Sequence, residues 1–276
     1  MNPVVHPESQ RLLDAVLRDS PHAVLMSGPT GVGLATIAKY YAKKSSAQLI
    51  TVLPEKNEAI DVEKGIITVD SIRRLYDVTR TIEPRGRIIV IDYTERMAPA
   101  AQNAFLKLLE EPSEGTQFML LTHQPELILP TIASRSQRVD IRPITQAQSN
   151  TFLDGLGVSD ATKRAQLLFI AEGLPAELTR LVSDEVMFEA RVSLIKDARS
   201  LVTGTAYDRL RIAKSYKDSR ADALILIEDS LKLLKRTIAA NGDAASLRVL
   251  TRFETIHKRL SEQGNVRLQL SATVMV

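Results

Sequence analysis

Three glycines lie close together near the N-terminus, in the stretch GPTGVGLAT at residues 28–36. The apolar run AVLM at residues 23–26 precedes this stretch, and a helical pattern follows it. Gly28, Gly31 and Gly33 let backbone N–H groups curl around phosphate oxygens, and the N-terminus of the following helix adds partial positive charge. The spacing therefore matches a phosphate-binding loop of the form G-x-x-x-x-G-K-[ST].

The side chains that give such a loop its chemistry are missing. Leu34 stands at the lysine position and Ala35 at the hydroxyl position, so the groups that bridge the β- and γ-phosphates and hold Mg²⁺ are absent from the motif. Lys39 lies more than a turn further along the helix and does not replace the lysine. On this stretch alone, a phosphate loop that keeps weak ATP or ADP binding and a glycine-rich turn without function both remain open.

A second candidate site follows the apolar run RIIVI (87–91), which is typical of a buried central strand. Asp92 comes directly after this run, where a carboxylate at the end of a strand can hold Mg²⁺ beside a nucleotide. Hydrolysing sites of this type carry a glutamate next, but the next residue here is Tyr93, and Glu95 has already left the strand. The alternative interpretation of Asp92 is a cap for the following helix.

A third candidate is Arg135, in the stretch SRS (134–136) after a short predicted helix. A guanidinium at a domain edge can neutralise transition-state charge on a nucleotide bound by a neighbouring subunit. The alternative is a solvated arginine or a surface ion pair.

The composition excludes several classes of function. The 276 residues contain no cysteine, which rules out disulfides, zinc–thiolate sites and a thiol nucleophile. The net charge is only +3, although 16 Lys/Arg stand against 10 Asp/Glu from Phe188 onward, a mild excess that is compatible with a polyanion nearby. No apolar run is long enough to span a membrane, and the N-terminus MNPVVHPESQ lacks the pattern of a secretory signal. We therefore expect a cytoplasmic protein.

The elements that must position these residues alternate between strands and helices in the first half of the chain. Apolar runs predict strands at residues 23–27, 48–53, 87–92, 117–122 and 137–141. The segment GIITVDSIRRLYDVTR (65–80) predicts a further short strand and an amphipathic helix capped by Asp70. After Pro143 the pattern is helical. The sequence therefore predicts an α/β domain with a doubly wound parallel sheet at residues 1–143, a small three-helix domain at 144–185 and an all-α domain at 186–276.

Taken in order, four stretches resemble one family: GPTGVG, GIITVDSIRRL, RIIVIDYTERMAPAAQNAFLKLLEEP and LLTHQPELILPTIASRSQ. They are similar to the clamp-loader branch of the AAA+ proteins, and within it to the delta-prime family of bacterial DNA polymerase III. The stretch AAQNAFLKLLEEP (100–112) is the most specific of them. The final residues IHKRLSEQGNVRLQLSATVMV extend the resemblance over essentially the whole chain.

The resemblance implies an AAA+ domain with a degenerate ATP-binding loop, a three-helix lid and a helical collar that assembles a pentameric ring. The implied partners are motor subunits, a delta-like subunit, the sliding clamp and, through the complex, primed DNA. In this family the local ATP site is commonly defunct, and an arginine in a Ser-Arg-Cys motif completes the ATP site of the adjoining motor subunit. Arg135 matches that arginine, and Thr122 or the adjacent His123 falls at the position called sensor 1.

The chain departs from the family pattern in three ways. Ser136 replaces the cysteine of the motif, which we expect to leave Arg135 in place. Ala176 stands where the lid carries a basic residue called sensor 2, so that charge is missing as well. The cysteine-ligated zinc module of many relatives is missing too, so we expect no zinc, no other metal site and no required cofactor.

Four groups that ATP hydrolysis needs are thus replaced, by Leu34, Ala35, Tyr93 and Ala176. Loss of a single charged group from a phosphoryl-transfer site can cost roughly 10³-fold in rate. The first hypothesis is therefore a non-catalytic subunit of the DNA replication clamp loader that supplies Arg135 in trans as an arginine finger. Two alternatives remain open: a motor-type clamp-loader ATPase with an atypical loop, and an AAA+ DNA-binding adaptor that acts outside replication.

Overall fold

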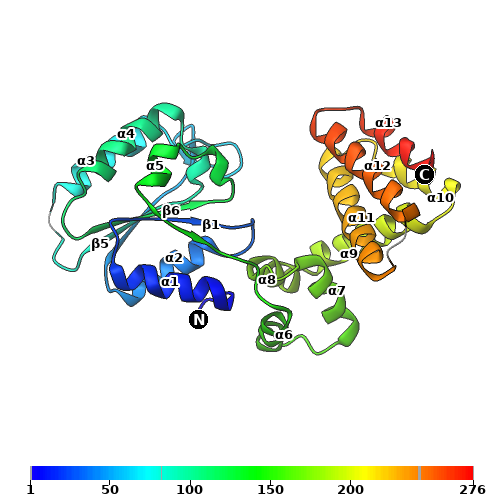
Figure 1. The fold of residues 1–276 in the computed structure, drawn as a ribbon, viewed down its shortest axis with the longest axis horizontal. Coiled ribbons are helices and arrows are strands. Elements are labelled where there is room, and N and C mark those ends of the chain that lie inside the picture. The colour runs from blue at the N-terminus through cyan, green and yellow to red at the C-terminus, as the bar shows by residue number, and fades with distance from the viewer. Residues whose placement is uncertain (1, 82, 242–243, 276) are drawn as a thin grey trace. The chain divides into compact units, whose positions relative to one another are not determined.

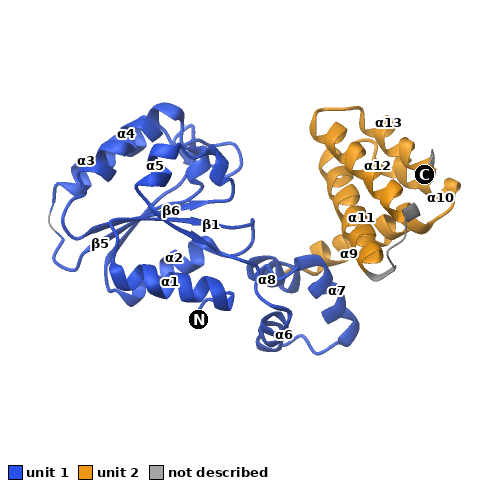
Figure 2. Cartoon of the chain, viewed as in Figure 1, with its two compact units in different colours: residues 1–183 blue, residues 184–276 orange. Residues whose placement is uncertain are grey.

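The computed structural model describes residues 2–81, 83–241 and 244–275 (Figure 1). The chain divides into two compact units, residues 1–183 and 184–276 (Figure 2). The expected boundary between an α/β domain and a three-helix domain, after residue 143, lies inside the first unit. The division into three domains therefore stays a prediction.

A parallel five-stranded sheet forms the centre of the first unit, in the order β2-β5-β6-β1-β7. Its strands are β1 (Ala23–Ser27), β2 (Gln48–Val52), β5 (Arg87–Ile91), β6 (Thr116–Thr122) and β7 (Gln137–Asp140). All four pairings are parallel, so the carboxyl ends of the strands lie at one edge of the sheet. The predicted fold class, an α/β parallel sheet followed by helices, is confirmed, and the segments after β1, β5 and β6 begin at the same edge.

Helices cover both faces of this sheet (Figure 1). They are α1 (Pro7–Asp19) and α2 (Leu34–Lys44) on one face, and α3 (Val69–Thr79), α4 (Pro99–Glu110) and α5 (Pro130–Ser134) on the other. Side chains alternate along a strand, so Val24 and Met26 pack toward α1 and α2 while Ala23 and Leu25 pack toward α3, α4 and α5. Because both faces are covered, the central strands β1, β5 and β6 are buried and largely apolar along their length.

The segment between β2 and α3 differs from the prediction. The two-residue strands β3 (Glu55–Lys56) and β4 (Ala59–Ile60) form a small antiparallel hairpin that no sequence pattern indicated. The predicted strand in GIITV is wrong, because Ile66 and Ile67 make only isolated bridges, to Glu55 and Met97. A two-residue pairing is too short to establish the alternation by which a strand is recognised.

The predicted cap of α3 is also wrong by two residues. Thr68 is the N-cap, and its Oγ1 accepts the backbone N–H of Ser71 at 3.2 Å. Asp70 lies in the first turn instead, where its carboxylate still interacts favourably with the helix dipole.

The rest of the described chain is helical. The first unit ends with α6 (Gln146–Gly155), α7 (Ala161–Ala171) and α8 (Pro175–Ser183). The second unit contains α9 (Glu185–Thr203), α10 (Ala206–Ser215), α11 (Arg220–Asn241), α12 (Ala244–Ser261) and α13 (Val266–Ser271). Short 3-10 turns are η1 (Thr94–Arg96), η2 (Pro125–Leu127) and η3 (Ala272–Met275). Within the described ranges, no helix is both long and apolar enough to cross a membrane.

Candidate functional site

The glycine-rich loop joins β1 to α2 at the carboxyl edge of the sheet. Gly31 and Gly33 have φ angles of +89° and +95°, a left-handed conformation that side chains rarely adopt. Gly28 is required for another reason, because a Cβ there would lie 2.6 Å from the carbonyl oxygen of Ile141. Gly33 is the N-cap of α2. The N–H groups of the first turn of this helix therefore lie next to the loop and have no acceptor inside the helix.

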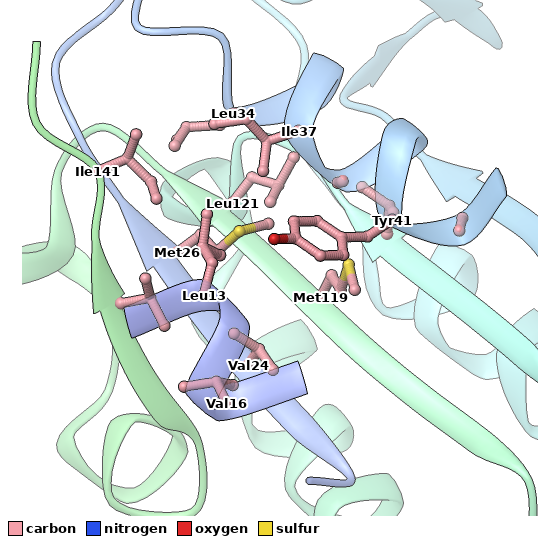
Figure 3. Close-up of a cluster of buried hydrophobic side chains, with 14 of the residues drawn as sticks. Leu13, Val16, Val24, Met26, Leu34, Ile37, Tyr41, Met119, Leu121 and Ile141 are labelled. Carbon is pink, nitrogen blue, oxygen red and sulfur yellow. The ribbon is translucent and has the colours of Figure 1, made fainter. Parts of the chain in front are cut away.

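The two positions that would carry the lysine and the hydroxyl contribute to packing instead. Leu34 is 2% exposed and belongs to the apolar core between the sheet and helices α1 and α2. Figure 3 shows it in this cluster together with Ile37 and Leu121. Ala35 packs against the same cluster. The Leu34 side chain therefore fills the core, whereas a lysine that bound phosphate would have to leave it.

A Leu34→Lys substitution is expected to lower the free energy of unfolding by about 2–3 kcal/mol, because the lysine either buries an ammonium group or turns outward and leaves a cavity. Urea unfolding measures this change, with the volume-conserving Leu34→Met variant as control, for which we expect a loss below about 1.5 kcal/mol. We also expect no ATP hydrolysis by the Leu34→Lys/Ala35→Thr variant, because Tyr93 and Ala176 remain. Unchanged stability of Leu34→Lys would contradict the packing role of this side chain.

Asp92 and Tyr93 follow β5 at the same edge of the sheet. The Oδ1 atom of Asp92 accepts the backbone N–H of Tyr93 at 3.0 Å, and burial raises the pKa of the Asp92 carboxyl, which disfavours the charged form that binds a cation. Tyr93 is the N-cap of η1 and Ala98 that of α4, so Asp92 is not a helix cap. The Tyr93 ring meets the ring of His123 edge-on at a centroid distance of 5.7 Å. Tyr93 thus occupies the position after β5 where a hydrolytic site carries a glutamate, and its ring packs against His123, just after the end of β6.

The end of β6 is joined to the glycine-rich loop. Thr122 is fully buried, and its Oγ1 accepts the backbone N–H of Gln124 at 3.1 Å. The Nδ1 atom of His123 lies 2.7 Å from the carbonyl oxygen of Gly28, and the His123 backbone N–H donates to Oε1 of Glu95 at 3.3 Å. Sequence reasoning missed the contributions of Glu95 and of the His123 ring, because no spacing relates segments that only the sheet brings together.

Helix α8 contacts the loop directly. The backbone N–H of Ala176 donates to the carbonyl oxygen of Gly31 at 3.0 Å. A cavity of about 180 Å³ lies beside this contact, and its walls include Gly33, Ala176 and Phe152 but no charged side chain. This volume is below the roughly 300–1,000 Å³ of typical small-molecule pockets. The structure thus brings the loop and the predicted sensor-2 position together around a small, uncharged cavity.

Arg135 does not line this cavity. It caps the C-terminus of α5, and its Nη2 lies 3.0 Å from Oε1 of Glu110 in a half-exposed ion pair. The Oγ of Ser136 donates to the carbonyl oxygen of Ile132 at 2.9 Å, so the serine at the cysteine position helps to fix the turn that presents Arg135. In the single chain Arg135 thus forms a surface ion pair, which is one of the alternatives that the sequence left open.

In the part of the chain that the structure describes, no group of three His, Cys, Asp or Glu side chains could hold a metal ion.

The fold and the site together define a class of protein. Strand β6 lies between β1, which leads into the glycine-rich loop, and β5, which leads to Asp92. A parallel sheet of this order, with three helices after β7 and a helical C-terminal unit, is the architecture of an AAA+ protein.

Comparisons with known proteins identify the family within this class. The family model described as DNA polymerase III, delta subunit, matches residues 9–145. The chain is 29% identical over 252 residues to the DNA polymerase III subunit tau of Bacillus subtilis. This match covers 82% of this chain and 43% of that protein. It is 30% identical over 203 residues to the DNA polymerase III subunit delta-prime of Pseudomonas aeruginosa. This match covers 66% of this chain and 61% of that protein. The chain belongs to the bacterial DNA polymerase III clamp-loader family.

Two further facts define the extent of this similarity. The crystal structure of a gamma subunit-related protein from Thermotoga maritima has the same fold, with a TM-score of 0.52 at 18% identity over 97% of both chains. The chain spans less than two thirds of the length of the tau and delta-prime subunits named above.

Proposed function

We propose that this chain is a non-catalytic, delta-prime-like subunit of the DNA replication clamp loader in the cytoplasm. It joins motor subunits and a delta-like subunit in a hetero-pentamer that places the sliding clamp on primed DNA. It supplies Arg135 in trans, as an arginine finger, to the ATP site of an adjoining motor subunit. It requires no cofactor and no zinc, and the backbone of the glycine-rich loop retains at most weak affinity for ATP or ADP.

The burial of Leu34 is the observation that carries this proposal. A motor subunit needs a cation at this position to bridge the β- and γ-phosphates, and here the position is part of the apolar core. The substitutions at Tyr93 and Ala176 act in the same direction, because each removes a charged group from the site. A chain that has lost these groups together has no means of stabilising the transferred phosphoryl group.

The proposal is tested by comparing the isolated chain with the reconstituted complex. We expect the isolated chain to release no phosphate from ATP and Mg²⁺ above the blank. The complex with its motor and delta-like subunits should hydrolyse ATP in response to clamp and primed DNA, and omission of this chain should abolish that response. Hydrolysis by the isolated chain that disappears in an Asp92→Asn variant would contradict the proposal, because a contaminating ATPase would not respond to this substitution.

A motor-type ATPase is the second candidate, and the similarity to the tau subunit over 82% of the chain favours it. Titration calorimetry with ATP and Mg²⁺ separates the two candidates. Tight binding of ATP that requires Mg²⁺ supports the motor, whereas weak binding that does not depend on Mg²⁺ supports the non-catalytic subunit, since the loop then contributes only backbone N–H groups.

A further inference from the structure

Two elements of the chain hold the guanidinium of Arg135. Its Nη1 donates to the carbonyl oxygen of Thr131, on helix α5 that Arg135 caps, at 3.2 Å. Its Nη2 lies 3.0 Å from Oε1 of Glu110, the last residue of α4. The backbone N–H of Arg135 donates to the carbonyl oxygen of Ile132 at 3.1 Å. Both the backbone and the tip of this arginine are thus fixed by the chain itself.

The carboxylate of Glu110 lies at the end of a helix that is packed firmly into the core. Helix α4 is anchored in the core by Phe105, Leu108 and Leu109, which are all buried. The ion pair itself is 40% exposed on the Arg135 side and 50% exposed on the Glu110 side. An ion pair at this level of exposure contributes little to folding, so its consequence is the orientation of the guanidinium.

Orientation matters because arginine is a long side chain with many rotamers. A guanidinium has five N–H donors in a planar fork, and the contacts with Thr131 and Glu110 engage one Nη atom each. The fork therefore keeps further donors for an incoming anion while its plane is already fixed. Charged groups that are oriented before the reaction stabilise a transition state better than groups that must reorganise.

We propose that Glu110 is a positioning residue for Arg135, which holds its guanidinium ready for the phosphate oxygens of a nucleoside triphosphate bound by the neighbouring subunit. This inference rests on the proposed function of Arg135 in trans. In this role Glu110 itself contacts neither the nucleotide nor the water that attacks it. It acts through Arg135 alone, so its effect must vanish when Arg135 is absent.

The test is a double-mutant cycle on the reconstituted complex, read as the clamp- and DNA-stimulated ATP hydrolysis. Glu110→Gln is expected to lower kcat about tenfold with little change in KM, because misplacement of a group by about 1 Å can cost up to about 10²-fold. Glu110→Asp keeps the charge but shortens its reach, and we expect an intermediate loss. Glu111→Gln, the same change of charge one residue further along, is the control and should leave the rate unchanged. In the Arg135→Ala background, Glu110→Gln should have no additional effect.

The possible results separate the two proposals. A normal rate in Glu110→Gln together with a strong loss in Arg135→Ala overturns the positioning role and leaves the proposed function intact. A normal rate in Arg135→Ala overturns both. A faster rate in Glu110→Gln would mean that the ion pair restrains Arg135, which also overturns the positioning role. If Glu110→Gln lowers the rate as much in the Arg135→Ala background as in the parent complex, its effect is structural and unrelated to the arginine, which overturns the positioning role. Size-exclusion chromatography of each complex checks that it assembles.

Discussion

Replacement of Arg135 by alanine is expected to lower the clamp- and DNA-stimulated ATP hydrolysis of the assembled complex by roughly 10³-fold or more, the magnitude typical of an arginine finger supplied in trans. Under the proposed function, the substitution removes a cation that neutralises charge on the transferred phosphoryl group of the neighbour's nucleotide. Steady-state phosphate release by the complex measures the effect. Under the proposed function the arginine contacts the nucleotide only across a subunit boundary, so no ATPase effect is expected in the isolated chain. There the substitution breaks the half-exposed ion pair with Glu110, which contributes little to folding.

Two controls decide how the Arg135→Ala result is interpreted. Arg138→Ala removes the same charge three residues further along, at another exposed position, and should leave the stimulated rate within about twofold of the parent, as expected for screened surface charge. Arg135→Lys keeps the charge but loses the planar fork, and should recover only part of the rate. The complex should still assemble with each variant. Equal losses in Arg135→Ala and Arg138→Ala would indicate a general electrostatic effect in place of a finger.

Much of the sheet could be predicted because its central strands β1, β5 and β6 are buried on both faces. The run IIVI at residues 88–91 has no polar residue to interrupt it, and the alternation of short strands with amphipathic helices indicates a parallel sheet. The hairpin of β3 and β4 could not be predicted, since two paired residues carry no periodicity. The choice of Thr68 over Asp70 as cap depends on where the first turn of α3 begins, and both residue types are good caps.

The site was predictable in its residue types but not in its contacts. The sequence identifies Leu34 as a departure from a phosphate loop, but only the fold shows that this side chain packs into the core. The bond from the Ala176 N–H to the Gly31 carbonyl uses backbone atoms that every residue type shares, so no side-chain pattern reveals it. Glu110 and Arg135 are 25 residues apart, one at the end of α4 and the other just after α5, and no helical spacing links them.

The largest stability effect in the second unit is expected at Asp229. This carboxylate lies on α11 with a side chain that is 2% exposed, and its Oδ2 is 2.9 Å from Nη1 of Arg191 on α9. Lys232, one turn along α11, approaches Oδ1 at 3.6 Å. The pair therefore connects α9 to α11 through a largely buried contact whose charges were removed from water when the helices packed.

Asp229→Ala is expected to destabilise the second unit by about 3–5 kcal/mol, because it leaves the Arg191 guanidinium buried without its partner. Urea unfolding of the full chain, followed by far-ultraviolet circular dichroism, measures the loss, and Asp218→Ala, at a side chain that is 85% exposed, should change the free energy of unfolding by less than about 0.5 kcal/mol. The attraction between two buried charges is largely offset by their desolvation, so the joint replacement Arg191→Met/Asp229→Leu should recover most of the loss. A double variant as unstable as Asp229→Ala would mean that the ion pair itself, and not the unpaired arginine, determines the stability of this helix contact.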